Sequence, residues 1–293
     1  MRILVIRHGA FGDIILTFPA FAAIRQQHAD DEITLLTTAP FAPLLRASPW
    51  FDKIEVDQRP KWWDVKGLRH LKRQLAGFDM VYDLQTSGRS THYFALAGKP
   101  AWSGIARGCA YPDGADRKAL HTRERLAQQL NLAGITMPLP TPDLSWLTSD
   151  LSGFALPQRY VVLVPGASPH RPEKRFPAEG FRDLVPFLQV PAVIIGTAQE
   201  APLAAVIGGL DLTGKTSFLQ LAAVLKGSSL AIGNDTGPMH LAAALGVPCI
   251  SLFSGASDPK LSAPRYPDGG WPVILRAPSL QGLQVAQIRA HLP

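Results

Sequence analysis

Cysteine is scarce in this chain of 293 residues, which contains only Cys109 and Cys249. A disulfide framework needs several cysteines in a short chain, and a zinc site needs closely spaced Cys or His pairs; neither pattern is present. A disulfide scaffold and a cysteine-based zinc site are therefore excluded. Cys249 lies in the apolar run "GVPCISLF", which predicts a buried thiol that packs as a small hydrophobic side chain.

Long apolar runs are also lacking. The longest uncharged stretch, "LAAALGVPCISLFSGAS", is interrupted by Gly246 and Pro248 and is too polar at its end to span a membrane. The opening "MRILVIRHG" carries charges and lacks the apolar segment and cleavage site of a signal peptide. We therefore expect a cytoplasmic protein.

The composition is that of a globular protein rich in turns, with 46% hydrophobic and 18% charged residues, 26 prolines and 25 glycines. The length suits two domains, each with its own core. There are 29 Lys and Arg against 23 Asp and Glu, a net charge of +6. This excess mildly favours an anionic partner, but charge alone does not choose among a nucleotide, a nucleic acid and an acidic membrane surface.

Short apolar runs alternate with helical patterns in both halves of the chain, which predicts two α/β domains with parallel sheets. The first half begins with "RILVI", "EITLLTT", "KIEV" and "DMVYDL", separated by helical segments. A proline-rich linker at about 136–157 follows, and the pattern restarts at "YVVLVPG". We expect domains at 1–150 and 158–276 and a helical tail at 277–293 near the domain junction. In such sheets ligands bind beyond the carboxyl ends of the strands.

The stretch "GGLDLTGKTS", residues 208–217, matches the G-x-x-x-x-G-K-[ST] pattern of a phosphate-binding P-loop. A P-loop requires a buried strand that runs directly into a glycine-rich turn opening a helix. Here a predicted helix precedes the match, and Leu210 and Leu212 alternate like a short strand within it. The context disfavours a P-loop NTPase or kinase.

The segment "AIGNDTGPMHLAAALG" carries the strongest indication of an anion site. A buried strand is predicted to end before Asp235, and Asp235 or Thr236 is placed to cap the next helix. Gly237 leaves the helix N-terminus open, where free N–H groups and the helix dipole favour a diphosphate. His240 lies within the first turn and is expected to point at the same ligand. Capping alone is the alternative, but it does not account for Gly237 and His240.

The segment "RHGAFGDIILTFPA" places a glycine-containing loop between a strand and a helix. The spacing of Gly9 and Gly12 is not the dinucleotide fingerprint, and Asp13 at the helix start would repel a pyrophosphate. A carboxylate in this position suits a general base for a substrate hydroxyl. The alternative is that Asp13 is the N-cap of the helix.

Two further stretches are basic. "VPGASPHRPEKRFP" contains Lys174 among other cations, which could neutralise a leaving diphosphate or form a solvated loop. "RPKWWDVKGLRHLKRQLAGF" sets six Lys and Arg residues and two tryptophans against Asp64. That combination fits an acidic, lipid-like interface. The alternative is a solvated helix face with Trp62 and Trp63 packed into the core.

Together these motifs resemble those of the family 9 glycosyltransferases, the ADP-heptose:lipopolysaccharide heptosyltransferases. "ILVIRHGAFGDIILTFPAFAAIR" is similar to the opening of the family, "VPGAS…EKRFP" to its Lys-x-aromatic-Pro segment, and "DLTGKTS…AIGNDTGPMHLAAALGVP" to its most diagnostic stretch. The resemblance implies the GT-B fold, an α/β architecture of two Rossmann-like parallel-sheet domains facing a cleft. It places the acceptor in the first domain and the nucleotide sugar in the second.

The resemblance also implies roles for individual residues. Asp13 would deprotonate the acceptor hydroxyl, and Lys174 would stabilise the diphosphate as ADP leaves. Lys215, Thr216 and Phe218 would pass beside the adenine, so the Lys215 side chain is expected to be dispensable for chemistry. The donor-binding set is Ser168, Glu200, Lys215, Thr216, Phe218, Asp235, Thr236, Gly237 and His240. The acceptor-binding set is Arg7, Gly12, Lys61 and Arg69.

The implied reaction is an inverting displacement that needs neither a metal nor a cofactor, because cations and a helix N-terminus stabilise the leaving ADP. The expected acceptor is the inner core of a lipopolysaccharide precursor, so the protein would lie on the inner face of the inner membrane and bind no nucleic acid. Two alternatives remain: a transferase of this fold with another nucleotide sugar or a protein acceptor, and a non-catalytic nucleotide-sugar-binding protein. The joint presence of Asp13, Lys174 and His240 disfavours the second.

Overall fold

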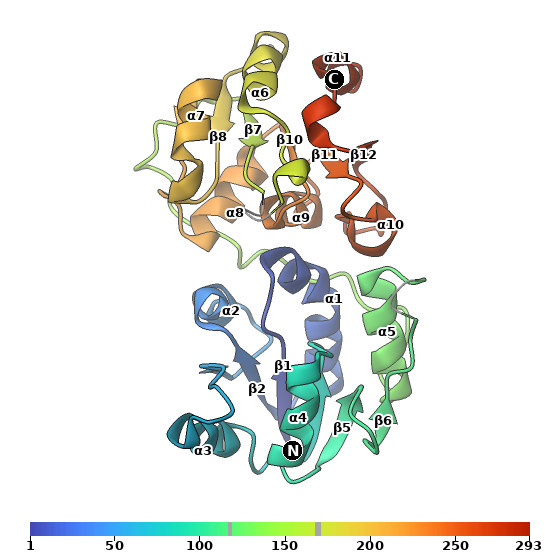
Figure 1. The fold of residues 1–293 in the computed structure, drawn as a ribbon. Helices are drawn as coiled ribbons and strands as arrows, with labels where there is room; N and C mark the ends of the chain where they lie inside the picture. The colour runs from blue at the N-terminus through green and yellow to red at the C-terminus, as the bar shows by residue number, and fades with distance from the viewer. Residues whose placement is uncertain (117–118, 168–170) are drawn as a thin grey trace. The chain divides into compact units, whose positions relative to one another are not determined.

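The computed structural model describes residues 1–293 except 117–118 and 168–170. The chain divides into two compact units, Met1–Trp146 and Leu147–Pro293 (Figure 1). Each unit contains one six-stranded sheet whose strands all pair in parallel. The predicted architecture of two Rossmann-like α/β halves is confirmed.

The first sheet has the strand order β3-β2-β1-β4-β5-β6. Its strands are β1 (Arg2–Ile6), β2 (Glu32–Thr37), β3 (Lys53–Val56), β4 (Met80–Asp83), β5 (Ala101–Gly104) and β6 (Tyr111–Pro112). Strand β1 is fully buried from Ile3 to Ile6, as expected for a central strand covered on both faces. Sequence patterns indicated the first four strands but not β5 and β6, which are too short for apolar alternation to stand out.

Helices cover both faces of the first sheet. They are α1 (Phe11–Gln27), α2 (Ala42–Arg46), α3 (Val65–Gln74), α4 (Gly88–Leu96) and α5 (Thr122–Leu132). Helices α1 and α5 lie side by side (Figure 1). Leu71 of α3 and Tyr93 of α4 pack in one core cluster with Leu4 and Ile6 of β1. Side chains alternate between the two faces of a strand, so Leu4 and Ile6 of β1 both lie on the face that α3 and α4 cover.

The second sheet has the order β12-β11-β10-β7-β8-β9, which repeats the topology of the first. Its strands are β7 (Val161–Val164), β8 (Ala192–Ile194), β9 (Leu210–Asp211), β10 (Leu230–Asn234), β11 (Cys249–Ser254) and β12 (Val273–Ala277). The helices are α6 (Ala178–Leu184), α7 (Ala201–Ile207), α8 (Phe218–Gly227), α9 (Gly237–Ala244), α10 (Pro259–Ser262) and α11 (Val285–Arg289).

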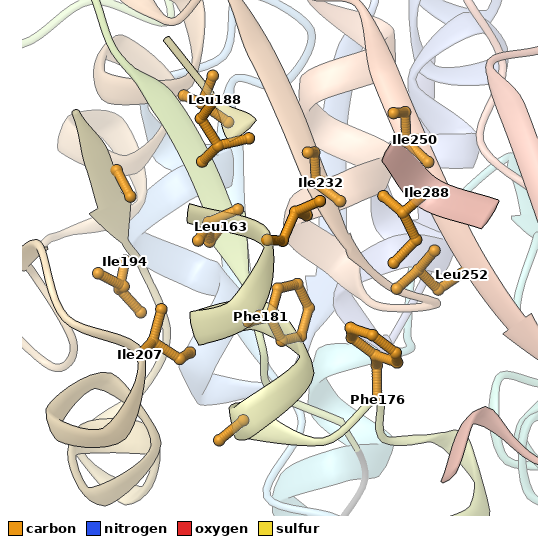
Figure 2. Close-up of a cluster of buried hydrophobic side chains, with 14 of the residues drawn as sticks. Leu163, Phe176, Phe181, Leu188, Ile194, Ile207, Ile232, Ile250, Leu252 and Ile288 are labelled. Carbon is orange, nitrogen blue, oxygen red and sulfur yellow. The ribbon is translucent and has the colours of Figure 1, made fainter. Parts of the chain in front are cut away.

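One core cluster fills the space between this sheet and α6, α7 and α11 (Figure 2). Phe181 of α6 and Ile288 of α11 are fully buried in it together with Leu163 and Ile232 of the central strands. Helix α11 packs on α6, and α8 packs on α9. Cys249 is buried as predicted, and burial raises the pKa of its thiol to about 12.

Both sheets change winding direction at a central strand pair, β1 with β4 and β7 with β10. At such a switch point the loops that leave the two strands diverge to opposite faces, and a crevice forms beyond their carboxyl ends. Arg7 and His8 directly follow β1, and Asp235 directly follows β10. The fold therefore places Arg7 of the first unit and Asp235 of the second at the edge where ligands bind in this topology.

Candidate functional site

Three polar side chains from separate segments meet at the switch point of the second sheet. Lys174 ends the short turn η2 (Pro172–Lys174), Asp235 follows β10, and His240 lies in the first turn of α9. Lys174 Nζ lies 3.1 Å from Asp235 Oδ2, and His240 Nε2 lies 3.9 Å from Asp235 Oδ1. The structure thus brings together residues that are 66 positions apart at most (240 − 174).

Asp235 is the centre of this cluster. Burial raises the pKa of its carboxyl group, but contacts with His240 and Lys174 outweigh burial and hold the pKa below its usual range. The side chains of Lys174 and Asp235 keep 16% and 12% exposure, so a ligand can reach them. The cluster therefore presents the Lys174 ammonium group, held by Asp235, at a partly exposed site.

The N-terminus of α9 lacks the side-chain cap that the sequence predicts. Thr236 occupies the N-cap position but accepts no capping hydrogen bond, and its Oγ1 donates instead to the carbonyl of Asn234 at 3.1 Å. Asp235 is engaged by Lys174 and His240. Thr236 is therefore the N-cap residue, one of the two that the sequence predicts, but its side chain does not form the capping hydrogen bond, and Asp235 is not the N-cap. The N–H of Gly237, the first residue of α9, therefore remains available for an anion, whereas Pro238 has no N–H to offer.

Asn234 organises the cluster, and no motif in the sequence pointed to it. Its side chain is fully buried, and Nδ2 donates to the carbonyls of Pro165 at 2.8 Å and Gly166 at 3.2 Å, while Oδ1 accepts from the Phe176 amide at 3.0 Å. One amide thus joins the loop after β7 to the segment that carries Lys174. The signal that could have found it is an asparagine at the end of an otherwise apolar strand. An amide buried there needs hydrogen-bond partners, which other segments must supply.

Asn234→Ala is expected to lower the free energy of unfolding by about 3 kcal/mol, because it leaves buried carbonyl and amide groups without partners. Urea unfolding measures this change. Gln281→Ala is the matched control, since exposed Gln281 donates to the Arg175 carbonyl at 2.9 Å in the same region and its loss should cost less than about 0.5 kcal/mol. Equal losses in the two variants would contradict the role given to Asn234.

Glu200 lies at the carboxyl edge beside β7 and β8. Its Oε2 accepts from the amide of Thr197 at 2.8 Å and from the Thr197 hydroxyl at 2.6 Å. A Cβ atom added at Gly166 or Gly196 would come within 3.2 or 3.0 Å of the Glu200 side chain. These glycines therefore make room for a buried carboxylate at this edge, while its contact with a nucleoside stays a prediction.

The segment that matches the P-loop pattern forms a different structure. Its middle is strand β9, which pairs in parallel with β8, and helix α8 begins only after the N-cap Ser217. Lys215 Nζ donates to the Asp211 carbonyl at 2.6 Å, so the lysine is tied to the turn that contains it. A strand cannot wrap its amides around phosphates, which agrees with the rejection of the P-loop. Thr216 and Phe218 flank Ser217, and Ser168 lies outside the described residues.

Asp13 and Arg7 meet at the switch point of the first sheet. Helix α1 begins at Phe11, so its N-cap is Ala10, and the interpretation of Asp13 as N-cap was wrong. Asp13 Oδ2 instead accepts from the Ala10 amide at 3.1 Å, and Oδ1 lies 3.5 Å from Arg7 Nη2. Arg7 also donates to the Leu84 carbonyl at 2.6 Å, which ties β1 to β4. The Asp13 side chain is 44% exposed, so its position is fixed while it can reach a substrate.

A buried polar network supports the loop that leads to Asp13. His8 Nε2 lies 3.0 Å from Asp57 Oδ2, and the Tyr93 hydroxyl donates to the same oxygen at 2.6 Å. Burial raises the pKa of Asp57, but contacts with His8, Tyr93 and the Arg59 amide outweigh it and hold the pKa below its usual range. No sequence pattern pointed to this network, because its members come from three separate segments.

Asp83, at the carboxyl end of β4, is buried beside the same edge. Burial raises the pKa of its carboxyl group to about 6, although Thr86 donates its backbone amide to Oδ1 at 2.9 Å. The folded state therefore holds the Asp83 proton more tightly than the unfolded state, whose pKa is near 3.8. The stabilising effect of this proton is complete below about pH 4 and is lost as the pH rises through 6.

Comparison of the wild type with Asp83→Asn isolates this effect, since the asparagine keeps an acceptor for Thr86 but does not ionise. The free energy of unfolding of the wild type relative to the variant is expected to fall by about 3 kcal/mol between pH 4 and 7. Urea unfolding across this range measures it. A difference that stays constant with pH would show that Asp83 does not carry the raised pKa.

Lys61 and Arg69, the other predicted acceptor-binding residues, lie on or next to α3 and are exposed. Trp62 and Trp63 precede α3 and are 48% and 75% exposed, so the interpretation that they pack into the core was wrong. Leu71 and Leu75 take the core positions of this helix. Gly12, in contrast, is the second residue of α1, directly before Asp13.

Among the described residues, no group of three His, Cys, Asp or Glu side chains could hold a metal ion. In the same part of the chain, no helix has both the length and the apolar character needed to cross a bilayer.

Comparisons with known proteins identify one family. The sequence model of the family described as glycosyltransferase family 9 (heptosyltransferase) matches residues 68–268. Lipopolysaccharide heptosyltransferase 1 of Escherichia coli O18:K1:H7 is 24% identical, and the alignment covers 99% of this chain and 95% of that protein. The sequence relationship thus extends over nearly the whole of both chains.

Solved structures show the same fold. A family 9 glycosyl transferase from Veillonella parvula superposes with a TM-score of 0.83 at 21% identity, covering 98% of this chain and 94% of that one. The E. coli heptosyltransferase WaaC with ADP superposes with a TM-score of 0.78 at 21% identity, covering 99% and 98%. At these identities the superpositions establish the GT-B fold.

Proposed function

The chain belongs to glycosyltransferase family 9, and we propose that it transfers a heptose from ADP-heptose to the inner core of a lipopolysaccharide precursor. The family resemblance of its motifs is thereby confirmed, and the chain is a glycosyltransferase. The observation that carries the specific proposal is the cluster of Lys174, Asp235 and His240 beside the uncapped N-terminus of α9. The names of its relatives, lipopolysaccharide heptosyltransferases, and the ADP in one related structure support the choice of donor and acceptor.

The second unit provides what a departing ADP requires. Negative charge grows on the diphosphate oxygen as the bond to the sugar breaks, and preorganised donors stabilise that charge. In the proposed complex, Lys174 and the backbone N–H of Gly237 contact the phosphates. Asp235 holds Lys174 in place before the donor binds. Because these groups supply positive charge, the proposed reaction needs no divalent metal and no cofactor.

The first unit provides the base. In the proposed step the acceptor hydroxyl gives its proton to Asp13, its oxygen forms a bond to the anomeric carbon, and ADP leaves with the electron pair of the broken bond. Attack opposite the leaving group inverts the anomeric configuration. Arg7 and the Ala10 amide hold the carboxylate in place, as they do in the free protein. The lipid-anchored acceptor would place this reaction on the cytoplasmic face of the inner membrane.

A donor series tests this function. Thermal shift and transfer assays would compare ADP-heptose with ADP-glucose, UDP-sugars and GDP-sugars, using a heptose-free inner-core lipopolysaccharide precursor as acceptor. We expect stabilisation by ADP-heptose and turnover with it that persists in EDTA. Preference for another nucleotide sugar, or turnover only with a protein acceptor, would favour a different transferase of this fold. Donor binding without transfer to any acceptor would favour a non-catalytic role, and loss of turnover in EDTA would contradict the metal-free mechanism.

A further inference from the structure

The surface formed by Lys61, Trp62, Trp63 and the outer side of α3 has no role in the chemistry described above. We call it the tryptophan–basic face; its members are Lys61, Trp62, Trp63, Val65, Lys66, Arg69, Lys72 and Arg73, all exposed. Trp63 is 75% and Val65 57% exposed. Large apolar side chains that gather on a surface mark an interaction site more often than single ones do.

Neighbouring cations hold the two indole rings in place at the surface. Lys61 Nζ lies 5.2 Å from the ring centre of Trp63, and Arg89 Cζ lies 5.1 Å from that of Trp62. The ring centres of Trp62 and His92 are 5.3 Å apart. These contacts fix the rings without covering them, so the rings are available to a partner.

The cations of this face form no ion pairs with the described part of the chain. Within the described residues, no ion pair involves any of its five cations, which are Lys61, Lys66, Arg69, Lys72 and Arg73. The acidic residue in the same stretch, Asp64, accepts from the Gly67 amide at 2.9 Å and serves as N-cap of α3. The face therefore presents a concentrated positive charge beside exposed aromatic rings.

We propose that the tryptophan–basic face docks on an anionic lipid bilayer, with both indole rings at the level of the head groups. Tryptophan prefers this level because its ring is apolar and its N–H is polar. Each Lys or Arg near an anionic surface strengthens binding by about fivefold. A polyanion without aromatic rings would account for the cations but not for two exposed tryptophans, and a single-stranded nucleic acid, whose bases can stack on tryptophan, would not account for exposed Val65. Charge and aromatic character together select the bilayer.

The position of the face in the first unit agrees with a bilayer as partner. This part of the inference rests on the proposed function, in which the acceptor is lipid-anchored. Trp62 contacts Arg89 and His92 of α4. The next residue of that helix, Tyr93, is joined through Asp57 to His8, in the loop that leads to Asp13. The face is thus connected to the edge of the first sheet where the acceptor is expected, and docking would bring that edge toward the bilayer.

Co-sedimentation with vesicles tests the proposal on the full-length protein. We expect binding to phosphatidylcholine vesicles that contain phosphatidylglycerol and not to vesicles of phosphatidylcholine alone. Trp62→Ala/Trp63→Ala and Lys66→Glu/Arg69→Glu should each weaken binding to the anionic vesicles by about tenfold or more. Phe187→Ala and Arg159→Glu/Lys226→Glu are the matched controls, because they change an exposed aromatic residue and the same number of exposed charges in the second unit. The controls should bind as the wild type does.

Three results would overturn the proposal: no binding to anionic vesicles, variants that bind as tightly as the controls, or loss of binding in the charge variant alone. The last would identify a surface for a polyanion and not for a bilayer. Thermal shift with ADP on each variant checks that the fold is intact. Vesicle binding needs no sugar donor, so a failed donor series would contradict the proposed function without changing the vesicle-binding result. Failed vesicle binding would contradict the docking surface without changing the donor specificity.

Discussion

Asp13→Ala is expected to lower the rate of sugar transfer by about 10²-fold or more while ADP binding stays near the wild-type level. The carboxylate is the proposed base for the acceptor hydroxyl, whereas the residues proposed to contact ADP belong to the second unit. Steady-state kinetics and thermal shift with ADP measure the two effects separately. Normal transfer by this variant would remove Asp13 from the mechanism.

Asp13→Asn distinguishes the base from a structural role. Asp13 accepts a hydrogen bond from the Ala10 amide, and asparagine retains an oxygen for that bond but cannot take up a proton at neutral pH. If Asp13 is the base, both variants lose transfer by about 10²-fold or more. An active Asp13→Asn enzyme beside an inactive Asp13→Ala enzyme would show that the residue only orders the start of α1.

Lys174→Ala is expected to lower kcat by about 10²-fold to 10³-fold, since it removes a cation from the charge that develops on the leaving diphosphate. The substitution also leaves the carboxylate of Asp235 without its partner at 3.1 Å, which should raise the pKa of Asp235 and destabilise the fold. Kinetics and thermal unfolding must therefore be measured together.

A double variant separates these two consequences. Lys174→Ala/Asp235→Asn removes the buried charge together with its partner, so it should recover much of the lost stability but none of the activity. Lys226→Ala is the control for loss of a lysine in the same unit, because Lys226 is exposed on α8 away from the cluster. Recovery of transfer in the double variant would mean that Lys174 only compensates Asp235.

Sequence patterns predicted the elements whose local signals are strong. The uninterrupted apolar runs of β1, β7 and β10 indicated buried central strands, and the glycine-rich turns that follow them indicated the ligand edge. Local patterns did not predict the elements between 85 and 135. Helices α4 and α5 are only weakly amphipathic, and strands β5 and β6, with four and two residues, are too short for a recognisable period. Such strands form only because a neighbouring strand already offers its backbone groups.

The sequence by itself determined the two α/β halves, the family and the segments that carry Asp13, Lys174 and His240, because apolar periodicity, glycine turns and motif spacing are local properties. The tertiary structure decided which partners these residues have. It paired Asp235 with Lys174, left the N-terminus of α9 uncapped, and placed Asn234 and Asp57 in buried networks. It also turned Trp62 and Trp63 outward, since Leu71 and Leu75 occupy the core side of that segment. Contacts between distant segments depend on how the elements pack, and no local pattern records them.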